Sequence, residues 1–266
     1  MKIFISADIE GITTTTVWDE CDNSHPAYPP HANQMTEEVL ACISGAKKAG
    51  AKEFFIKDAH ADATNIDPTR MPSGVSLLRN WSGHPYGMAD GVDKSFDAAM
   101  FIGYHSSAGR IGNPMAHTIS GSRVQSIKVN GILTSEFLLY SWACALEGVP
   151  TVFLSGDKTL CEDFKDLHPK LLTCPVKDSA GTMTINYSVE DTLKNITELS
   201  EMALSQDLGK ALVKLPNRFE VEIEYKSHIH AHKAAWFPGV VRKNDIAVTF
   251  QSDSYFEVLR TINWII

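Results

Sequence analysis

The amino-acid sequence predicts an α/β fold: a mostly parallel central sheet flanked by helices, followed by a smaller α+β subdomain at the C-terminal end. In the first half of the chain, short apolar or β-branched runs alternate with helical patterns, which is the order that parallel strands with crossover helices produce. After Pro175 the pattern changes to one long amphipathic segment and then to a strand with one polar face. A chain of 266 residues is long enough to bury a full core.

The first part of the chain contains five predicted strands and two predicted helices. Segment 32–50 has apolar residues at helical spacing and ends in two lysines and Gly50, which is a typical helix stop. Segment 134–148 is the second helix, with Thr134 or Ser135 as its expected cap. Strands are expected at residues 2–8, 53–59, 98–104, 122–131 and 149–157.

Four further elements are expected in the last third of the chain. They are a long amphipathic helix over 188–209, strands over 218–225 and 246–251, and a helix over 254–265. No linker marks a clean boundary between domains. We place the larger α/β domain at residues 1–215 and the smaller C-terminal subdomain at 216–266.

Composition argues against several classes of partner. A formal net charge of -8 does not suit a protein that binds nucleic acid through a basic surface. The five cysteines are odd in number and include no C-x-x-C pair, which favours reduced thiols over a disulfide framework. No signal peptide is apparent, and the longest apolar region is interrupted by Glu147, Gly148 and Pro150. We therefore expect a soluble cytoplasmic protein with no membrane partner.

Two acidic residues, Asp8 and Glu10, follow the first predicted strand in the segment SADIEG. Residues two apart in a strand point to the same face, so the two carboxylates share a face if the strand continues through Glu10. Like charges at that separation are unfavourable unless a cation lies between them or one of them takes a proton. The pair therefore predicts either a metal ion or a shared proton.

Further residues of metal-binding type follow two other predicted strands. Asp58 and His60 lie at the end of the strand 53–59, and His105 follows the strand 98–104. Ligand sites in parallel α/β sheets gather at the carboxyl ends of strands, and imidazole and carboxylate groups suit zinc. Each residue alone also has an ordinary explanation, such as a turn cap for Asp58. Their coincidence at three strand ends favours a metal site.

His117 and Glu136 are less distinctive when judged by position alone. His117 lies in the glycine-rich loop 104–121, where a histidine can transfer protons near neutral pH or can be an ordinary loop residue. Glu136 lies in the first turn of the helix 134–148, where a carboxylate usually interacts favourably with the helix dipole. The position of each residue by itself favours the ordinary explanation.

The histidine-rich tract SHIHAHK at 227–233 is a separate candidate. In a strand, His228, His230 and His232 would share one face, and histidine-rich tracts can bind metal. No carboxylate follows the tract closely, and the sequence AAWFPGV after it is typical of a packed segment. We expect no functional zinc site there.

Five segments of the chain resemble the DppA-like zinc D-aminopeptidases and occur in the same order. They are SADIEG at 6–11, KDAH at 57–60, FIGYHSSAG at 101–109, AHTISG at 116–121 and LTSEF at 133–137. The resemblance covers nearly the whole chain, including GVPTVFLSGD at 148–157 and FPGVVR at 237–242. One departure lies beside the site, because this chain has Ala61 where family members often carry glycine.

The resemblance implies a peptidase with two zinc ions per subunit that removes the N-terminal residue, named in the family as a D-amino acid, from short peptides or amides. It also implies a ring-like homo-oligomer. It identifies the bridging ligand with Asp8, the other zinc ligands with Glu10, His60, His105 and Glu136, and the catalytic histidine with His117. For Glu136 this implication replaces the helix-dipole explanation. His117 would act as nucleophile, as proton donor or as oxyanion stabiliser.

Two alternatives remain open at this point. Haloacid-dehalogenase-like phosphohydrolases also begin with a strand followed by D-x-D-G, but here the second acid is Glu10, and the histidines would have no role. The other alternative is a non-catalytic oligomeric module that keeps the metal site without turnover. Hydrolysis of peptides with and without a chelator separates these possibilities.

Overall fold

The computed structural model describes residues 1–168 and 170–266 and contains two sheets. Sheet A has seven strands in the order β3-β2-β1-β4-β7-β8-β9, and sheet B has five strands in the order β11-β12-β10-β5-β6. Neighbours in sheet A are parallel except β8 and β9. Sheet B is antiparallel. The predicted α/β fold with a mostly parallel central sheet is confirmed.

The elements have the following bounds. Sheet A consists of β1 Lys2–Ala7, β2 Glu53–Asp58, β3 Val75–Leu78, β4 Ala98–Tyr104, β7 Thr151–Asp157, β8 Leu172–Ala180 and β9 Met183–Asn186. Sheet B consists of β5 Val124–Val129, β6 Ile132–Leu133, β10 Phe219–Tyr225, β11 Val241–Arg242 and β12 Ala247–Ser252. The α-helices are α1 Tyr28–Lys48, α2 Glu136–Leu146, α3 Lys158–Asp163, α4 Val189–Ser205, α5 His228–Ala234 and α6 Tyr255–Ile265. Short 3-10 helices are η1 Trp18–Glu20, η2 Pro68–Arg70, η3 Gly87–Ala89 and η4 Leu208–Ala211.

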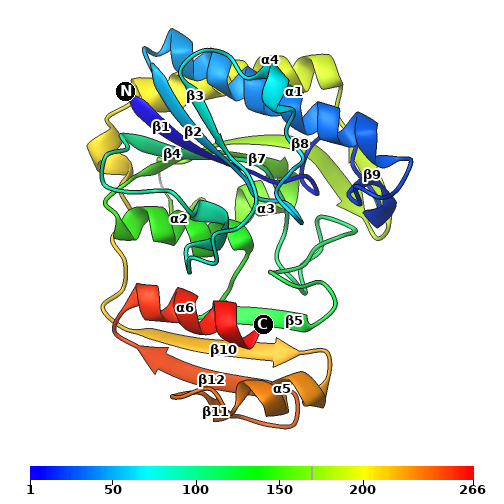
Figure 1. Cartoon of the computed structure of the whole chain (residues 1–266), viewed down its shortest axis with the longest axis vertical. Coiled ribbons are helices and arrows are strands. Elements are labelled where there is room, and N and C mark those ends of the chain that lie inside the picture. The colour runs from blue at the N-terminus through cyan, green and yellow to red at the C-terminus, as the bar shows by residue number, and fades with distance from the viewer. Residues whose placement is uncertain (169) are drawn as a thin grey trace.

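Helices cover both faces of sheet A (Figure 1). The helices α1 and α4 pack together over one face, and α2 and α3 lie on the other. Helix α6 contacts α2 as well as strands β10 and β12, so it links sheet B to the larger part of the molecule. The result is a layered α/β body with sheet B attached below α2.

Strand β1 is mostly apolar because it lies in the middle of sheet A. Its residues from Ile3 to Ala7 are buried, as expected for a central parallel strand covered on both faces. Ile3 and Ile5 pack in the core shared with α1 and α4, whereas Phe4 packs in the core shared with α2 and sheet B. The alternation of side chains along one strand therefore serves two separate cores.

The order of the strands determines where a site can form. Strand β1 pairs with β2 on one side and with β4 on the other, so the chain builds the sheet outward in two directions from β1. Crevices outside the carboxyl ends of strands at such a reversal are the usual ligand sites of open α/β sheets. The predicted candidates Asp8, His60 and His105 follow β1, β2 and β4.

Some local expectations differ from the structure. The predicted helix 188–209 ends at Ser205, and η4 follows it. The histidine tract is helical as α5, so His228, His230 and His232 do not share the face that a strand would give them. Strand β8 was not predicted, because Pro175 and charged residues interrupt its apolar pattern.

The division of the chain at residues 215 and 216 stays a prediction, although sheet B takes β5 and β6 from the earlier segment. All five cysteines are free and buried. None of the helices within the described residues combines the length and the apolar character needed to cross a membrane.

Candidate metal centre and active site

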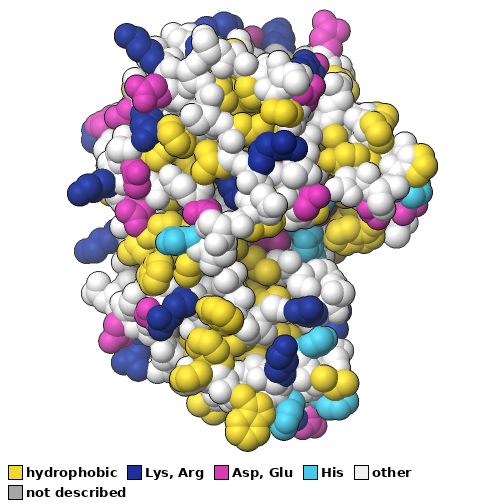
Figure 2. Space-filling view, viewed as in Figure 1, with side chains coloured by type: hydrophobic (Ala, Val, Ile, Leu, Met, Phe, Trp, Pro, Cys, Tyr) yellow, Lys and Arg dark blue, Asp and Glu magenta, His cyan; other side chains and the backbone are white. Residues whose placement is uncertain are grey.

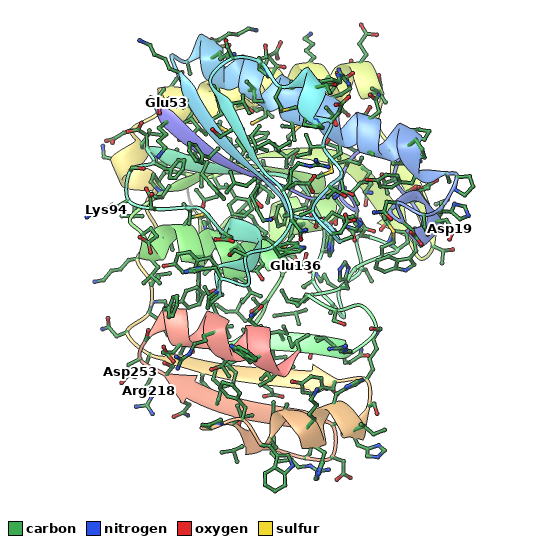
Figure 3. The ribbon with its side chains drawn as sticks, in the orientation of Figure 1. Asp19, Glu53, Lys94, Glu136, Arg218 and Asp253 are labelled. Carbon is green, nitrogen blue, oxygen red and sulfur yellow. The ribbon has the colours of Figure 1, made fainter. Side chains whose placement is uncertain are left out.

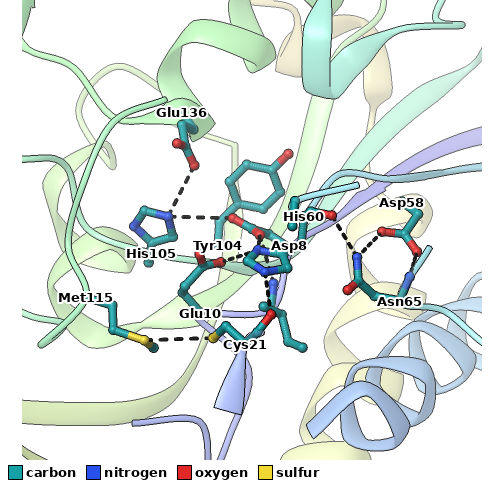
Figure 4. Close-up of polar contacts among 12 residues, drawn as sticks. Asp8, Glu10, Cys21, Asp58, His60, Asn65, Tyr104, His105, Met115 and Glu136 are labelled. Atoms are coloured by element: carbon teal, nitrogen blue, oxygen red, sulfur yellow. Dashed lines mark hydrogen bonds and ion pairs between the residues drawn. The ribbon is translucent and has the colours of Figure 1, made fainter. Parts of the chain in front are cut away.

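The five predicted metal ligands converge at the carboxyl ends of β1, β2 and β4 (Figure 4). They are Asp8, Glu10, His60, His105 and Glu136, and all of them are buried. Glu136 lies near the middle of the molecule, between sheet A and the part that carries sheet B (Figure 3). Figure 2 shows a hollow at this level of the surface, with histidine and acidic side chains in it.

The loop after β1 is pressed against the end of β4, which places Asp8 and Glu10. The amides of Asp8 and Gly11 donate to the carbonyls of Ile102 and Gly103 at 2.9 and 2.8 Å. A Cβ at position 11 would lie 1.8 Å from the Tyr104 carbonyl oxygen, so only glycine fits there. The glycine of SADIEG therefore allows the close approach of two backbones.

His60 is positioned by the carboxylate of Asp58, which is not itself a member of the cluster. Asp58 accepts hydrogen bonds from the amides of Asn65 and Ile66 at 2.6 and 2.7 Å, and from Asn65 Nδ2 at 2.8 Å. Asn65 Nδ2 also donates to the carbonyl of His60 at 2.8 Å. Asp58 thus organises the loop that carries His60, as a turn-capping aspartate does.

Asp8 presents one carboxylate oxygen to each of two histidines. Its Oδ1 lies 3.3 Å from His60 Nδ1, and its Oδ2 lies 3.6 Å from His105 Nε2. Glu10 Oε2 is 3.0 Å from His60 Nδ1, and Glu136 Oε2 is 3.2 Å from His105 Nε2. Asp8 therefore stands between two groups of donors, each completed by one histidine and one glutamate.

The donor atoms fall into groups of three that lie within 4.8 Å of one another. One group is Asp8, Glu10 and His60, and a second is Asp8, His105 and Glu136. A third combination joins Glu10 and His105 with His117. The first two groups share Asp8, which is the arrangement that a carboxylate bridging two metal ions requires.

The three histidines are each oriented by a main-chain carbonyl. The pairs, each at 2.9 Å, are His60 Nε2 with Cys21, His105 Nδ1 with Ser106, and His117 Nδ1 with Met115. A carbonyl oxygen only accepts, so the bonded nitrogen carries the hydrogen and the other nitrogen of a neutral ring carries a lone pair. In metal sites the same arrangement fixes the tautomer and directs the lone pair at the ion.

The free nitrogens and the carboxylates fit a cation between them. Lone pairs that face carboxylate oxygens repel them unless positive charge intervenes. Among the described residues, Glu10 Oε2 and His105 Nε2 are buried without a hydrogen bond of acceptable geometry, despite their close neighbours. Nitrogen and oxygen donors of this kind are zinc ligands. The donor set is therefore suitable for zinc.

The pKa values of His60 and His105 also indicate that the carboxylates of the cluster favour positive charge beside them. Burial alone would lower the pKa of His60, but the charges of Glu10 and Asp8 raise it well above its ordinary value. Burial likewise opposes the charged form of His105, but Glu136 and the other carboxylates raise the pKa of His105 to about 10. The buried carboxylates thus draw in positive charge, which protons or metal ions can supply.

The side chain of Glu136 contacts the cluster, and Ser135 caps helix α2. The Ser135 hydroxyl accepts from the amide of Leu138 at the start of α2. Glu136 Oε1 accepts from the amide of Ile119 at 2.6 Å and lies 3.6 Å from His117 Nε2. The helix-dipole explanation of Glu136 therefore misses its main contacts.

His117 lies at the edge of the cluster and faces a pocket. Its ring stacks on that of His105 with centroids 4.4 Å apart, and its side chain is 13% exposed. The pocket has a volume of about 360 Å³ and includes Asp8, Glu10 and Glu136 in its lining. A ring nitrogen at this edge can exchange a proton with a bound molecule.

Sequence patterns gave no indication of two polar residues that hold the loop of Glu10. Lys177 on β8 is buried, and its Nζ donates to the carbonyls of Glu10 and Thr15 at 2.5 and 2.6 Å. Asn113 Nδ2 donates to the Glu10 carbonyl at 2.8 Å. Burial lowers the pKa of Lys177 to about 8. Both residues bind backbone, and no motif marks such contacts.

Comparison with known proteins gives a consistent result along the whole chain. The family Peptidase_M55, described as D-aminopeptidase, matches residues 1–264. A D-aminopeptidase of Bacillus subtilis (strain 168) is 26% identical over 265 residues, which are 98% of this chain and 95% of that relative. The structure of the Zn-dependent D-aminopeptidase DppA from Bacillus subtilis, described as a self-compartmentalizing protease, superposes with a TM-score of 0.91 at 25% identity. That match covers 100% of this chain and 96% of the other.

Proposed function

The chain belongs to the M55 family of D-aminopeptidases, and from this premise we propose that it is a dinuclear zinc enzyme that removes an N-terminal D-amino acid from short peptides or amides. The observation that carries the proposal is the pair of donor groups that share Asp8 beside a small pocket. The resemblance to DppA-like zinc D-aminopeptidases is confirmed by the family match. It replaces the phosphohydrolase alternative.

Charge supports two ions rather than one. Asp8, Glu10 and Glu136 bring three negative charges into a buried cluster. One divalent ion with neutral histidines would leave net negative charge in a site of low dielectric, which is costly. Two divalent ions would offset all three carboxylates and leave one positive charge, which a hydroxide from water would balance. We assign Asp8, Glu10 and His60 to one ion, and Asp8, His105 and Glu136 to the other.

The reaction needs an activated water and a proton for the leaving amine. Zinc, when bound, lowers the pKa of water to about 7 and polarises a carbonyl. Among the protein groups, His117 is placed to move the proton through Nε2, because its Nδ1–H is engaged by the carbonyl of Met115. Glu136 Oε1 lies 3.6 Å from this Nε2. We therefore assign His117 the role of proton carrier to the leaving amine.

The size of the pocket and the relatives support the finer features of the proposal. A volume of about 360 Å³ suits one or two residues of a peptide rather than a folded chain. The related structure is described as self-compartmentalizing, which supports a ring-like homo-oligomer for this chain as well. Five free thiols support the cytoplasm as its compartment.

The proposal is tested by metal analysis together with hydrolysis of paired D- and L-aminoacyl amides. We expect about two zinc ions per chain, turnover of the D-amides, and loss of turnover in the presence of a chelator. His117→Ala should lower kcat at least about 100-fold while the zinc content stays near two. Sedimentation of the purified protein measures its assembly.

His228→Ala is the matched control, because His228 lies on the surface of α5, outside the cluster. It should leave turnover unchanged. Full activity of metal-free protein would contradict the zinc mechanism. Two bound zinc ions without turnover of any amide would favour the non-catalytic module instead.

A further inference from the structure

Two large aromatic side chains in the active-site region are unexplained by core packing. Trp81 is 39% exposed and Trp18 is 50% exposed, and both line the pocket of about 360 Å³ beside the cluster. A single exposed apolar side chain is ordinary, but two tryptophans that line the same pocket are typical of a ligand-binding surface. They lie on separate segments, Trp81 after β3 and Trp18 in η1, so a molecule bound in the pocket can contact both.

Trp81 is held firmly in place. Its Nε1–H donates to the carbonyl of Ala61 at 2.7 Å, and its backbone amide donates to Asn80 Oδ1 at 2.8 Å. The Nζ of Lys57 lies 4.0 Å from the ring centroid and donates to the carbonyl of Asn80 at 2.6 Å. A rigid indole of this kind offers a binding surface without further loss of side-chain entropy.

Apolar residues line the same pocket as Trp81. They include Ala59, Ala61, Met88 and Ile119. No lysine or arginine is among the described residues that line this pocket. An acidic side chain would therefore find no lysine or arginine in the described lining to pair with, whereas an apolar or aromatic side chain can be buried there.

Trp18 and His117 stand at the border between two cavities. Their ring centroids are 5.3 Å apart. Both residues line the first pocket and also an adjoining cavity of about 380 Å³ that includes Gly121 and Ser122. The amine that leaves after cleavage takes its proton from His117. The second residue of the substrate, which carries this amine, therefore belongs on the side of Trp18.

We propose that Trp81 is the specificity wall for the first residue of the substrate, which is apolar or aromatic, and that Trp18 contacts the residue that leaves. This assignment rests on the proposed aminopeptidase function. It divides substrate recognition between two tryptophans on separate loops. Each can therefore be tested by a different change in the substrate.

The experiment compares kcat/KM for dipeptides that vary at one position at a time. In wild-type protein, D-Phe-Gly and D-Leu-Gly should exceed D-Glu-Gly at least about 10-fold. Trp81→Ala should shift the ratio of D-Phe-Gly to D-Ala-Gly at least about 10-fold toward alanine. Trp18→Ala should instead shift the ratio of D-Ala-Phe to D-Ala-Gly toward glycine. Trp236→Ala, at an exposed tryptophan that does not line this pocket, should shift neither ratio.

Equal losses on all dipeptides, with zinc content reduced, would assign Trp81 a structural role and overturn the proposal. So would a wild-type preference for the acidic dipeptide. Trp81→Phe is the control for misfolding of Trp81→Ala. It keeps an aromatic ring and should retain part of the preference for D-Phe-Gly over D-Ala-Gly. If the wild-type protein hydrolyses no dipeptide, the proposed function fails. Calorimetry then still tests the proposed contact of Trp81 with the first residue, by comparing the binding of D-phenylalanine and D-alanine. Equal affinities for the two amino acids would overturn the proposal.

Discussion

Asp8 differs from the other four candidate ligands because it belongs to both donor groups. Its two carboxylate oxygens face His60 and His105, whereas Glu10 joins Asp8 only in the group with His60 and Glu136 joins it only in the group with His105. Residue types and spacing suggested that Asp8 and Glu10 share a cation or a proton. They could not show that Asp8 reaches a second histidine, because that contact depends on how β1 and β4 pair.

The shared role of Asp8 predicts unequal effects on zinc content. Glu136→Gln removes one charged ligand and should leave about one zinc per chain, whereas Asp8→Asn should leave close to none. Metal analysis after gel filtration measures both values. The matched control is Glu147→Gln, a change at the end of α2 away from the cluster. Equal zinc contents in Asp8→Asn and Glu136→Gln would contradict the bridging role.

His168 predicts a sensitivity to acid that is separate from the active site. It is buried against Phe137, and neither ring nitrogen has a hydrogen-bond partner within the described part of the chain. Burial lowers the pKa of His168 to about 4, compared with 6.5 when unfolded. The unfolded chain therefore binds the extra proton first. The stability that depends on neutral His168 is complete above pH 6.5 and is lost as the pH falls toward 4, by about 3 kcal/mol.

His168→Phe should reduce this loss, because phenylalanine keeps the packing and cannot take a proton. Urea unfolding of wild-type and variant protein at pH 7.0 and at pH 4.5 measures the difference. The variant should lose less stability between the two pH values than the wild-type protein. Parallel losses in the two proteins would refute this role for His168.

At the scale of elements, the candidate ligands Asp8, His60 and His105 are positioned by the loops after β1, β2 and β4 more than by the strands themselves. The strands themselves were predictable, since each is an apolar run of suitable length. The loop geometry was not, because it depends on contacts between backbones such as that of Gly11 with Tyr104, and on the buried amine of Lys177. Glu136 illustrates the same limit: its position in the first turn of α2 suggested a helix-dipole role, and only the family resemblance indicated a ligand.

The close approach at Gly11 predicts that Gly11→Ala is strongly destabilising. The new Cβ would meet the carbonyl of Tyr104, a backbone atom that cannot move aside without shifting β4. We expect a loss of about 3 kcal/mol in the free energy of unfolding, together with weaker zinc binding. Urea denaturation provides the measurement. Gly209→Ala is the control, since the nearest atom to its new Cβ is Asp207 Oδ1 at 3.4 Å, and its effect should stay within about 0.5 kcal/mol.

At the scale of the whole molecule, the cluster joins segments that are distant in the chain. Asp8, His60 and His105 follow three strands of sheet A, and Glu136 begins the helix that lies between sheet A and α6. The α/β class was predictable from the alternation of strands and helices. The composition of sheet B was not, because β5 pairs with β10, a strand more than 80 residues later, and no local pattern records that pairing.

Because the ions would tie these segments together, removal of zinc should lower global stability. With free zinc at about 100 times the dissociation constant, each bound ion adds about 2.7 kcal/mol to the free energy of unfolding. Thermal unfolding with and without a chelator measures this difference, and hydrogen exchange should show the largest change in the loops after β1, β2 and β4. A chelator that leaves the melting temperature unchanged would argue against this coupling.

The main-chain carbonyls that orient His60, His105 and His117 have a consequence for divergence among relatives. Side chains at Cys21, Ser106 and Met115 are not needed for these hydrogen bonds, since every amino acid offers the same carbonyl. Sequence drift at those three positions leaves the imidazole alignment intact as long as the loops keep their course. Remote homologues are therefore better recognised by loop lengths and by the ligands themselves than by the identity of the neighbouring side chains.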